Sequence, residues 1–294
     1  MKKANFQNIL IISKQSAYKL YFMDNSLNSR QPMSRKLKED RDRFKRAHDA
    51  HYKTLELITS FLLANGVRHE IANRGSHYDL SPYDLIISVG GDGTFLEAAR
   101  RVKTQTLIGI NSAPGISVGR FCMPAGTDVA GALKKILYGK FTAGELHRLE
   151  LSIDNQPKVE VLNEILVAHH NPAYLCRYEI NIGKSREEQR SSGVWISTAA
   201  GSSGAIYSAG GKLQNLYSKQ LQYLPRELYK GSRQRYNLTG GLIQSRHKIV
   251  LTSLMRKGMI YTDGPHFRLP FGYGSILTVK VSRRPLKVIK NFIA

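Results

Sequence analysis

The chain has 294 residues, enough for two domains that each bury a core of their own. Its 41% hydrophobic and 22% charged residues argue against wholesale disorder, and no apolar run approaches the roughly 20 residues of a membrane-spanning helix. Lys and Arg outnumber Asp and Glu by 44 to 22, so the formal charge of +22 favours anionic ligands. No helix-turn-helix, zinc-finger or RNP-type motif accompanies this charge, so nucleic acid is a poor candidate partner.

The first part of the chain alternates between strand and helix patterns. Its start carries two lysines and an apolar stretch, but polar residues interrupt that stretch and no cleavage pattern follows, so a buried strand at 9–12 is a better interpretation than a signal peptide. The alternation predicts an α/β domain at residues 1–141 with an open, mostly parallel sheet. The other predicted elements are strands at 67–72, 85–90 and 106–111, a helix at 51–64 that ends at Asn65–Gly66, and a helix from Thr94.

Between the first strand and the first helix lies a charged connection at residues 28–50. It combines charges of both signs without apolar periodicity, which is typical of a disordered insertion or a surface helix. Neither interpretation makes it a binding site.

From residue 142 the pattern changes to strands, which predicts a β-rich second domain at 142–294 whose final residues can pack back on the first domain. The dipeptide Asp263–Gly264 between two strand patterns indicates a hairpin. We expect a solvated turn at 184–190 and a surface helix within 216–237, where aromatic and basic residues interleave. The expected strands are 148–154, 157–170, 176–183, 193–198, 248–255, 259–263, 266–270 and 276–282.

The sequence offers no metal or disulfide framework. Cys122 and Cys176 form no ligand pattern, so we expect free thiols in a reducing cytoplasm. His169 and His170 are adjacent, but no second ligand cluster stands at metal spacing, so we interpret them as structural or exposed.

The stretch VGGDGTFLEAAR carries the first chemical signal, because Asp92 stands between Gly91 and Gly93 where a strand gives way to a helix. In an isolated glycine turn the usual role of such an Asp is a turn bond or an N-cap. Glycines and a helix N-terminus, however, form a loop that suits a phosphate. A carboxylate inside a phosphate loop needs a proton to accept or a metal to hold, so the combination predicts phosphoryl transfer to a hydroxyl.

Two further segments break the strand texture of the second domain. Asn163 and Glu164 are neighbours in an apolar run, and both can face one ligand only at a bulge or a strand end. Residues 197–211, STAAGSSGAIYSAGG, are small enough for a flat ligand or a phosphate to lie against the backbone. Together with the Asp92 loop they predict a nucleotide cleft between the two domains.

The order of these motifs resembles the NAD kinases, and most closely the mitochondrial-type branch of that family. The resemblance runs from the first strand through VGGDGTFLEAAR, LNE and SGVWISTAAGSSGAIYSAGG to the Asp263–Gly264 hairpin. It implies a two-domain kinase, usually a homodimer, that uses ATP or polyphosphate with Mg²⁺ to phosphorylate the adenosine ribose 2′-hydroxyl of NAD. Asp92 would then act on the acceptor hydroxyl. The implied binding residues are Gly91, Gly93, Thr94, Asn163, Glu164, Ser192, Thr198, Gly201, Ser202, Ser203 and Ser208.

The chain departs from the common bacterial family pattern at several of these positions. Ser192 replaces an Asp, Ala199–Ala200 replace Pro-Thr, and Ala205 replaces a tyrosine whose ring would stack on NAD. Arg190 could compensate by donating a hydrogen bond to a phosphate group of the ligand, although a lone Arg is more often a solvated charge. Two alternatives therefore stay open: a kinase of the same superfamily with a lipid or another nucleotide as acceptor, and a non-catalytic basic protein that binds nucleotides or nucleic acid.

Overall fold

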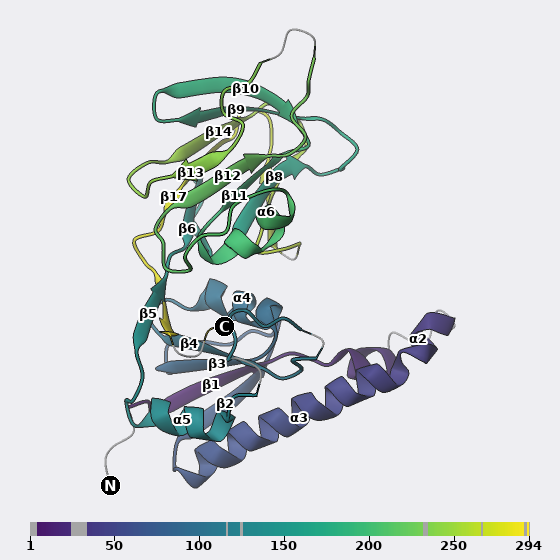
Figure 1. Ribbon diagram of the computed structural model, residues 1–294, viewed down its shortest axis with the longest axis vertical. Helices are drawn as coiled ribbons and strands as arrows, with labels where there is room; N and C mark the ends of the chain where they lie inside the picture. The colour runs from purple at the N-terminus through teal and green to yellow at the C-terminus, as the bar shows by residue number, and fades with distance from the viewer. Residues whose placement is uncertain are drawn as a thin grey trace. The chain divides into compact units, whose positions relative to one another are not determined.

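The computed structural model describes residues 5–24, 34–115, 117–123, 126–231, 235–265, 267–290 and 293. The chain divides into two compact units: unit 1 comprises Met1–Gly144 with Lys287–Ala294, and unit 2 comprises Glu145–Leu286 (Figure 1). Among the described residues, no helix combines the length and the apolar character that a membrane crossing requires.

Unit 1 is built on a six-stranded sheet with the order β2-β1-β3-β4-β18-β5. The pairs β1–β2, β1–β3, β3–β4 and β4–β18 are parallel, and every residue of β3 is buried, as expected for a sheet covered on both faces. The strands are β1 (Asn8–Ser13), β2 (Arg68–Asn73), β3 (Leu85–Gly90), β4 (Thr106–Asn111), β5 (Ala143–Leu146) and β18 (Leu286–Ile289).

Within the described part of unit 1, three helices longer than two turns cover this sheet: α3 (Arg41–Ala64), α4 (Asp92–Arg101) and α5 (Val129–Leu137). The charged connection proves to be surface helix from residue 35 onward, as α2 (Arg35–Glu39) and the first half of α3, while residues 28–33 lie outside the described part of the chain. Helix α3 ends as predicted, with Asn65 as C-cap and Gly66 at φ +66°. A short π-helix, η1 (Lys19–Met23), follows β1.

Unit 2 consists of two six-stranded antiparallel sheets, ordered β10-β9-β14-β17-β6-β7 and β13-β12-β11-β8-β15-β16. Side chains from both sheets form one hydrophobic core, for example Leu151, Ile180 and Leu251 from the first and Ile196 and Ile260 from the second. The strands are β6 (Leu149–Ile153), β7 (Val159–Val161), β8 (Glu164–His169), β9 (Cys176–Ile182), β10 (Ser185–Ser191), β11 (Val194–Ser197), β12 (Leu221–Pro225), β13 (Gly241–Ile243), β14 (Ile249–Ser253), β15 (Gly258–Thr262), β16 (Phe267–Phe271) and β17 (Ile276–Val281).

Two sequence predictions for unit 2 are wrong. Residues 184–190 are not a solvated turn, because Ser185–Ser191 form β10, which pairs with β9 at the edge of its sheet. Charged side chains are common on edge strands, where they prevent further pairing, and the charge of this segment hid its inward-facing Gln189. Residues 216–237 contain no surface helix among their described positions; they contain β12, whose Leu221 and Tyr223 are buried.

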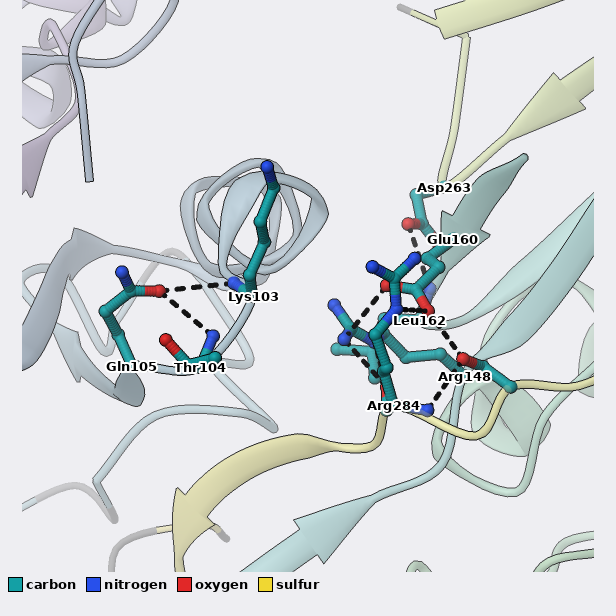
Figure 2. Close-up of polar contacts among 9 residues, drawn as sticks. Lys103, Thr104, Gln105, Arg148, Glu160, Leu162, Asp263 and Arg284 are labelled. Atoms are coloured by element: carbon teal, nitrogen blue, oxygen red, sulfur yellow. Dashed lines mark hydrogen bonds and ion pairs between the residues drawn. The ribbon is translucent and has the colours of Figure 1, made fainter. Parts of the chain in front are cut away.

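A buried ion pair ties β6, β7 and the end of β17 together (Figure 2). Arg148, 1% exposed, places Nη2 3.0 Å from Glu160 Oε2 and donates through Nε and Nη2 to the Arg284 carbonyl. Ser282 Oγ donates to Glu160 Oε1. Because Glu160 lies on β7, three residues before Asn163, this network holds the segment that leads to the predicted ligand pair.

Candidate active site

In unit 1, the glycine loop joins the carboxyl end of β3 to the start of α4. Gly91 is the N-cap of α4 and Asp92 its first residue, two positions earlier than the predicted helix start at Thr94. A Cβ at Gly90 would overlap the Thr94 hydroxyl, and one at Gly91 would overlap the Ser117 hydroxyl. Only glycine therefore allows the loop to lie this close to its neighbours.

Asp92 is not the N-cap of α4, since Gly91 takes that position, and its carboxylate bonds outside the helix. Asp92 Oδ1 accepts a hydrogen bond from the Phe121 amide at 2.9 Å. The Phe121 ring stacks on Phe95 of α4 with centroids 5.2 Å apart, which fixes that amide. The carboxylate thus has a defined orientation at the carboxyl edge of a parallel sheet, where ligands of such sheets bind.

Two cations accompany the loop. The Lys14 amide donates to the Val89 carbonyl at 3.3 Å, which places Lys14 beside the last residues of β3. Arg74 lies against Gly93, since a Cβ there would be 3.3 Å from Arg74 Nη1, and it pairs with Glu97 Oε2 at 2.7 Å. Burial, followed by the positive charge of Arg74, lowers the pKa of Lys14. An anion at the loop would stabilise the charged form of Lys14 and so offset both contributions to its lowered pKa.

A buried histidine connects the two strands that flank β3. His51 of α3 is fully buried; its Nε2 lies 3.0 Å from Ser13 Oγ at the end of β1, and its Nδ1 lies 2.7 Å from Ser112 Oγ just after β4. The Ser112 amide in turn donates to the Gly90 carbonyl at 3.2 Å. Burial, with the charge of Lys14, lowers the His51 pKa to about 4, so the ring is neutral at pH 7 and holds the loop through hydrogen bonds alone.

In unit 2, Asn163 and Glu164 lie at the start of β8, the strand end that the sequence analysis required. The Asp263 carboxylate fixes this turn by accepting from the Leu162 amide at 3.2 Å, as Figure 2 shows. It also accepts from the Asn163 amide at 2.7 Å. Asn163 Oδ1 and Glu164 Oε2 are buried and have no hydrogen-bond partner among the described residues. Buried polar atoms are nearly always paired, so these two oxygens indicate a place for a ligand.

Glu164 is poised between its charged and neutral forms. Burial raises its pKa to about 7, and the negative charge of Asp263 adds to the effect. Near pH 7 its carboxyl can therefore either donate or accept a hydrogen bond. This suits a partner with both capacities, such as a hydroxyl group.

The Ser/Ala/Gly segment folds as a 3₁₀ turn, η2 (Ala200–Ser203), and one helical turn, α6 (Ala205–Ser208). Thr198 Oγ1 donates to the Leu162 carbonyl at 2.6 Å and accepts from the Gly201 amide, and Ser202 Oγ accepts from the Gln214 amide. Thr198 Oγ1 therefore both donates and accepts within the fold, whereas Ser202 Oγ is used as an acceptor. Gly201 and Gly204 allow the segment to pack against Asn163 and Glu164, because a Cβ at Gly204 would lie 2.8 Å from Glu164 Oε2.

A hollow of about 460 Å³ opens beside Glu164 and brings together residues from distant parts of unit 2. Of the predicted residues it includes Glu164 and Ser192, and also Ala205. Asn163, Arg190, Thr198, Gly201, Ser202, Ser203 and Ser208 are not part of its lining. The Arg190 amide bonds to the Tyr236 hydroxyl.

Sequence reasoning missed the aromatic wall of this hollow. Trp195 on β11 and Tyr261 on β15 both pair with Leu166 of β8, so the three side chains form one row across neighbouring strands. Tyr174 and His169 also line the hollow, with ring centroids 4.6 Å apart, and so does His170, which is exposed as the sequence analysis allowed. The alternation in VWIS and MIYTD could have shown which side chains share a face.

Asp263 was also missed, because the Asp-Gly dipeptide had a sufficient explanation as a turn. The hairpin between β15 and β16 is confirmed, with Asp263 at φ +46° and Gly264 at φ +98°. The carboxylate of the turn residue nevertheless serves a different segment, residues 162–163. Nothing in the local sequence indicates that long-range bond.

Comparison with known proteins gives the following matches. No protein-family model matches the chain. A protein of Oryza sativa subsp. japonica named "Probable NADH kinase" is 30% identical over 268 residues, which are 81% of this chain and 81% of that protein. An NAD kinase of Archaeoglobus fulgidus is 27% identical over 245 residues, covering 83% of this chain and 90% of that protein.

The fold matches a crystal structure described as an NAD kinase from Archaeoglobus fulgidus in complex with ATP. The match has a TM-score of 0.71 at 23% identity and covers 97% of this chain and 94% of that chain. The predicted architecture, an α/β unit with a mostly parallel sheet followed by a β-rich unit, is therefore confirmed.

Proposed function

The chain belongs to the NAD kinase family, and we propose that it transfers a phosphoryl group from ATP to the adenosine ribose 2′-hydroxyl of NAD, yielding NADP. In this reaction the ribose oxygen bonds to the γ-phosphorus, the bond from that phosphorus to the bridging oxygen breaks, and ADP leaves. Phosphoryl transfer asks the protein mainly for alignment and for stabilisation of charge.

One observation carries the proposal: the orientation of the Asp92 carboxylate within a glycine loop. The Phe121 amide holds Oδ1 at 2.9 Å, which leaves Oδ2 to take the proton of the acceptor hydroxyl as that hydroxyl attacks. The Gly93 amide in the first turn of α4 would face the phosphates, whereas the Thr94 amide donates to the Gly91 carbonyl at 2.9 Å and closes the loop.

Unit 2 supplies a place for the dinucleotide. Asn163 Oδ1 and Glu164 Oε2 are buried oxygens without a hydrogen-bond donor among the described residues. Ribose hydroxyls or an adenine amino group can donate to them. The aromatic wall of the neighbouring hollow suits a planar ring. It would serve in place of the tyrosine that the chain lacks at Ala205.

Mg²⁺ would enter with the nucleotide. The described residues contain no group of three His, Cys, Asp or Glu side chains that could hold a metal ion. Mg²⁺ needs no such group, because it is commonly held by substrate phosphates, water and one or two carboxylates. Asp92 is the carboxylate at the loop; the ion would neutralise charge on the donor phosphates.

The setting of the activity follows from the same family membership. Cys122 and Cys176 are buried free thiols, which supports a location in the reducing cytoplasm. We also extend to this chain the homodimer and the role in NADP supply that the resemblance implies. Polyphosphate as donor and NADH as acceptor belong to the same chemistry, because neither changes the atoms that react.

The proposal is tested by incubating the purified protein with NAD, MgATP and an NADP-specific dehydrogenase that reports NADP. Wild type should form NADP, and Asp92→Asn should form almost none while keeping its thermal unfolding profile, since the amide preserves shape and removes the base. Normal turnover by Asp92→Asn would refute the role of Asp92. Failure of wild type with NAD and NADH, and with either donor, would shift the acceptor to another hydroxyl.

A further inference from the structure

Lys14 occupies an unusual position for a lysine. It follows β1 directly, at the carboxyl edge of the parallel sheet, and it is half-buried rather than exposed. Its Cδ lies 3.4 Å from the position that a Cβ of Gly90 would take, so the side chain runs along the glycine loop. On either side of Lys14 the chain is anchored, because the Lys14 amide bonds to the Val89 carbonyl and the Ser13 carbonyl accepts from the Arg74 amide at 2.7 Å.

The charges around this ammonium group are of its own sign. Arg74 is the charged side chain that acts most strongly on it, and the thiol of Cys122 is neutral at pH 7 because burial raises its pKa to about 12. Among the described residues, no Asp or Glu carboxylate forms an ion pair with Lys14, whereas Arg74 has Glu97. A half-buried cation without a counter-ion is unfavourable, and the deficit is removed when an anion binds.

We propose that Lys14 is the phosphate-binding cation of the glycine loop and contacts the phosphate chain of the donor. This inference rests on the proposed function for the identity of the donor, but the anion-binding part of it does not. The loop supplies backbone N–H groups at the start of α4, and Lys14 supplies the full positive charge that the loop itself lacks. Asp92 stays directed at the acceptor through the Phe121 amide, so the two side chains have separate tasks.

Arg74 has a different role. Its Nε is held by Glu97 Oε2, and the other oxygen of Glu97 accepts from the Gly75 amide at 2.6 Å. The guanidinium thus has a fixed carboxylate partner and lies against Gly93. It shapes the wall of the loop, while Lys14 carries the uncompensated charge.

A second basic region of unit 1 provides the necessary comparison. A hollow formed by residues 77–81 and 100–105 has Arg101 and Lys103 in its lining. Arg101 is fixed there over the Tyr78 ring, with Cζ 4.5 Å from the ring centroid, and Asp79 contributes a negative charge. The Lys103 and Thr104 amides are already bound by Gln105 Oε1, as Figure 2 shows, so this hollow lacks the free amides that an anion would use.

The test combines a kinetic and a binding measurement on Lys14→Met, which keeps the aliphatic stem and removes the charge. We expect the KM for ATP to rise, or kcat to fall, so that kcat/KM for ATP drops roughly 10- to 100-fold, the range of a lost charge-assisted hydrogen bond. The KM for NAD should stay within twofold. Lys14→Arg should recover most of the activity, and the melting temperature of Lys14→Met should not fall, because a half-buried cation has been removed.

The binding measurement uses inorganic tripolyphosphate, which carries the charge of the donor without its base. It should raise the melting temperature of wild type and Lys14→Arg, and not of Lys14→Met. Lys103→Met, in the second basic hollow, is the matched control and should behave as wild type.

The outcomes separate this inference from the proposed function. If wild type forms no NADP but tripolyphosphate binding still requires Lys14, the anion site stands and the proposed reaction is wrong. The inference itself is overturned if Lys14→Met retains the wild-type KM for ATP and the tripolyphosphate response, if wild type binds no tripolyphosphate, or if Lys103→Met abolishes the binding instead.

Discussion

Glu164 should make the stability of unit 2 depend on pH in a calculable way. Its pKa is raised from 4.5 to about 7 by burial and by the charge of Asp263, and its side chain is only 8% exposed. In the unfolded chain this carboxyl ionises near 4.5, while in the folded protein it stays protonated up to about 7. Because the pKa is higher in the folded state, the contribution of the neutral Glu164 to stability is fully present below pH 4.5 and is lost as the pH rises through 7.

The size of the loss follows from the shift. At about 1.36 kcal/mol per pKa unit, ionising Glu164 in the folded state costs about 3 kcal/mol. Glu164→Gln removes the ionisation, so the free energy of unfolding of the variant minus that of wild type should rise by about 3 kcal/mol between pH 4.5 and pH 8. The absolute offset between the two proteins is irrelevant, because only its change with pH is used.

Trp195 makes this measurement possible. It is the single tryptophan of the chain and lies on β11 beside the same hollow, so its fluorescence during urea unfolding reports on unit 2. Glu188→Gln, at an exposed position on β10, controls for the removal of a carboxylate from this unit. A difference between Glu164→Gln and wild type that stays constant across pH 4.5–8 would show that Glu164 is not held in its neutral form.

Two further predictions concern buried polar contacts. Glu160→Ala should lower the free energy of unfolding by about 3–5 kcal/mol in urea titrations, because it removes the carboxylate that pairs with the buried Arg148 guanidinium; a loss under 1 kcal/mol would mean that solvent reaches the pair. His51→Ala should lower kcat for NADP formation while leaving the KM for NAD unchanged, since His51 holds the strands that flank the glycine loop, and His51→Gln, whose amide can bond to both serines, should recover part of the rate. Equal kinetics for the two variants would reduce His51 to a packing residue.

The elements with strong local signals were predictable from sequence. The buried apolar run before Gly90, the Asn65–Gly66 helix end and the Asp263–Gly264 hairpin all depend on residues within a few positions of one another. Sequence reasoning failed where a partner strand decides the structure. Residues 185–191 look like a polar turn until their pairing with β9 buries Gln189 and Ser191.

The candidate site shows the same division. The residue types at Asp92, Asn163 and Glu164 indicated polar chemistry, but not what surrounds them. The Phe121 amide on Asp92 and the Asp263 carboxylate below Asn163 come from positions 29 and 100 residues away in the chain. Thr198 and Ser202 have a structural role that the sequence did not indicate, because Thr198 Oγ1 donates to the Leu162 carbonyl and Ser202 Oγ accepts from the Gln214 amide.

The position of β18 constrains the order in which the protein can fold during synthesis. The strand lies between β4 and β5 in the sheet of unit 1, although all of unit 2 separates it from β4 in the chain. At about 5–20 residues per second, a ribosome needs roughly ten to thirty seconds to proceed from β4 to β18. During that interval the edge of β4 has no neighbour and is open to pairing with other chains. Unit 2 can meanwhile complete its own core, so the part synthesised first is the part whose sheet is completed last.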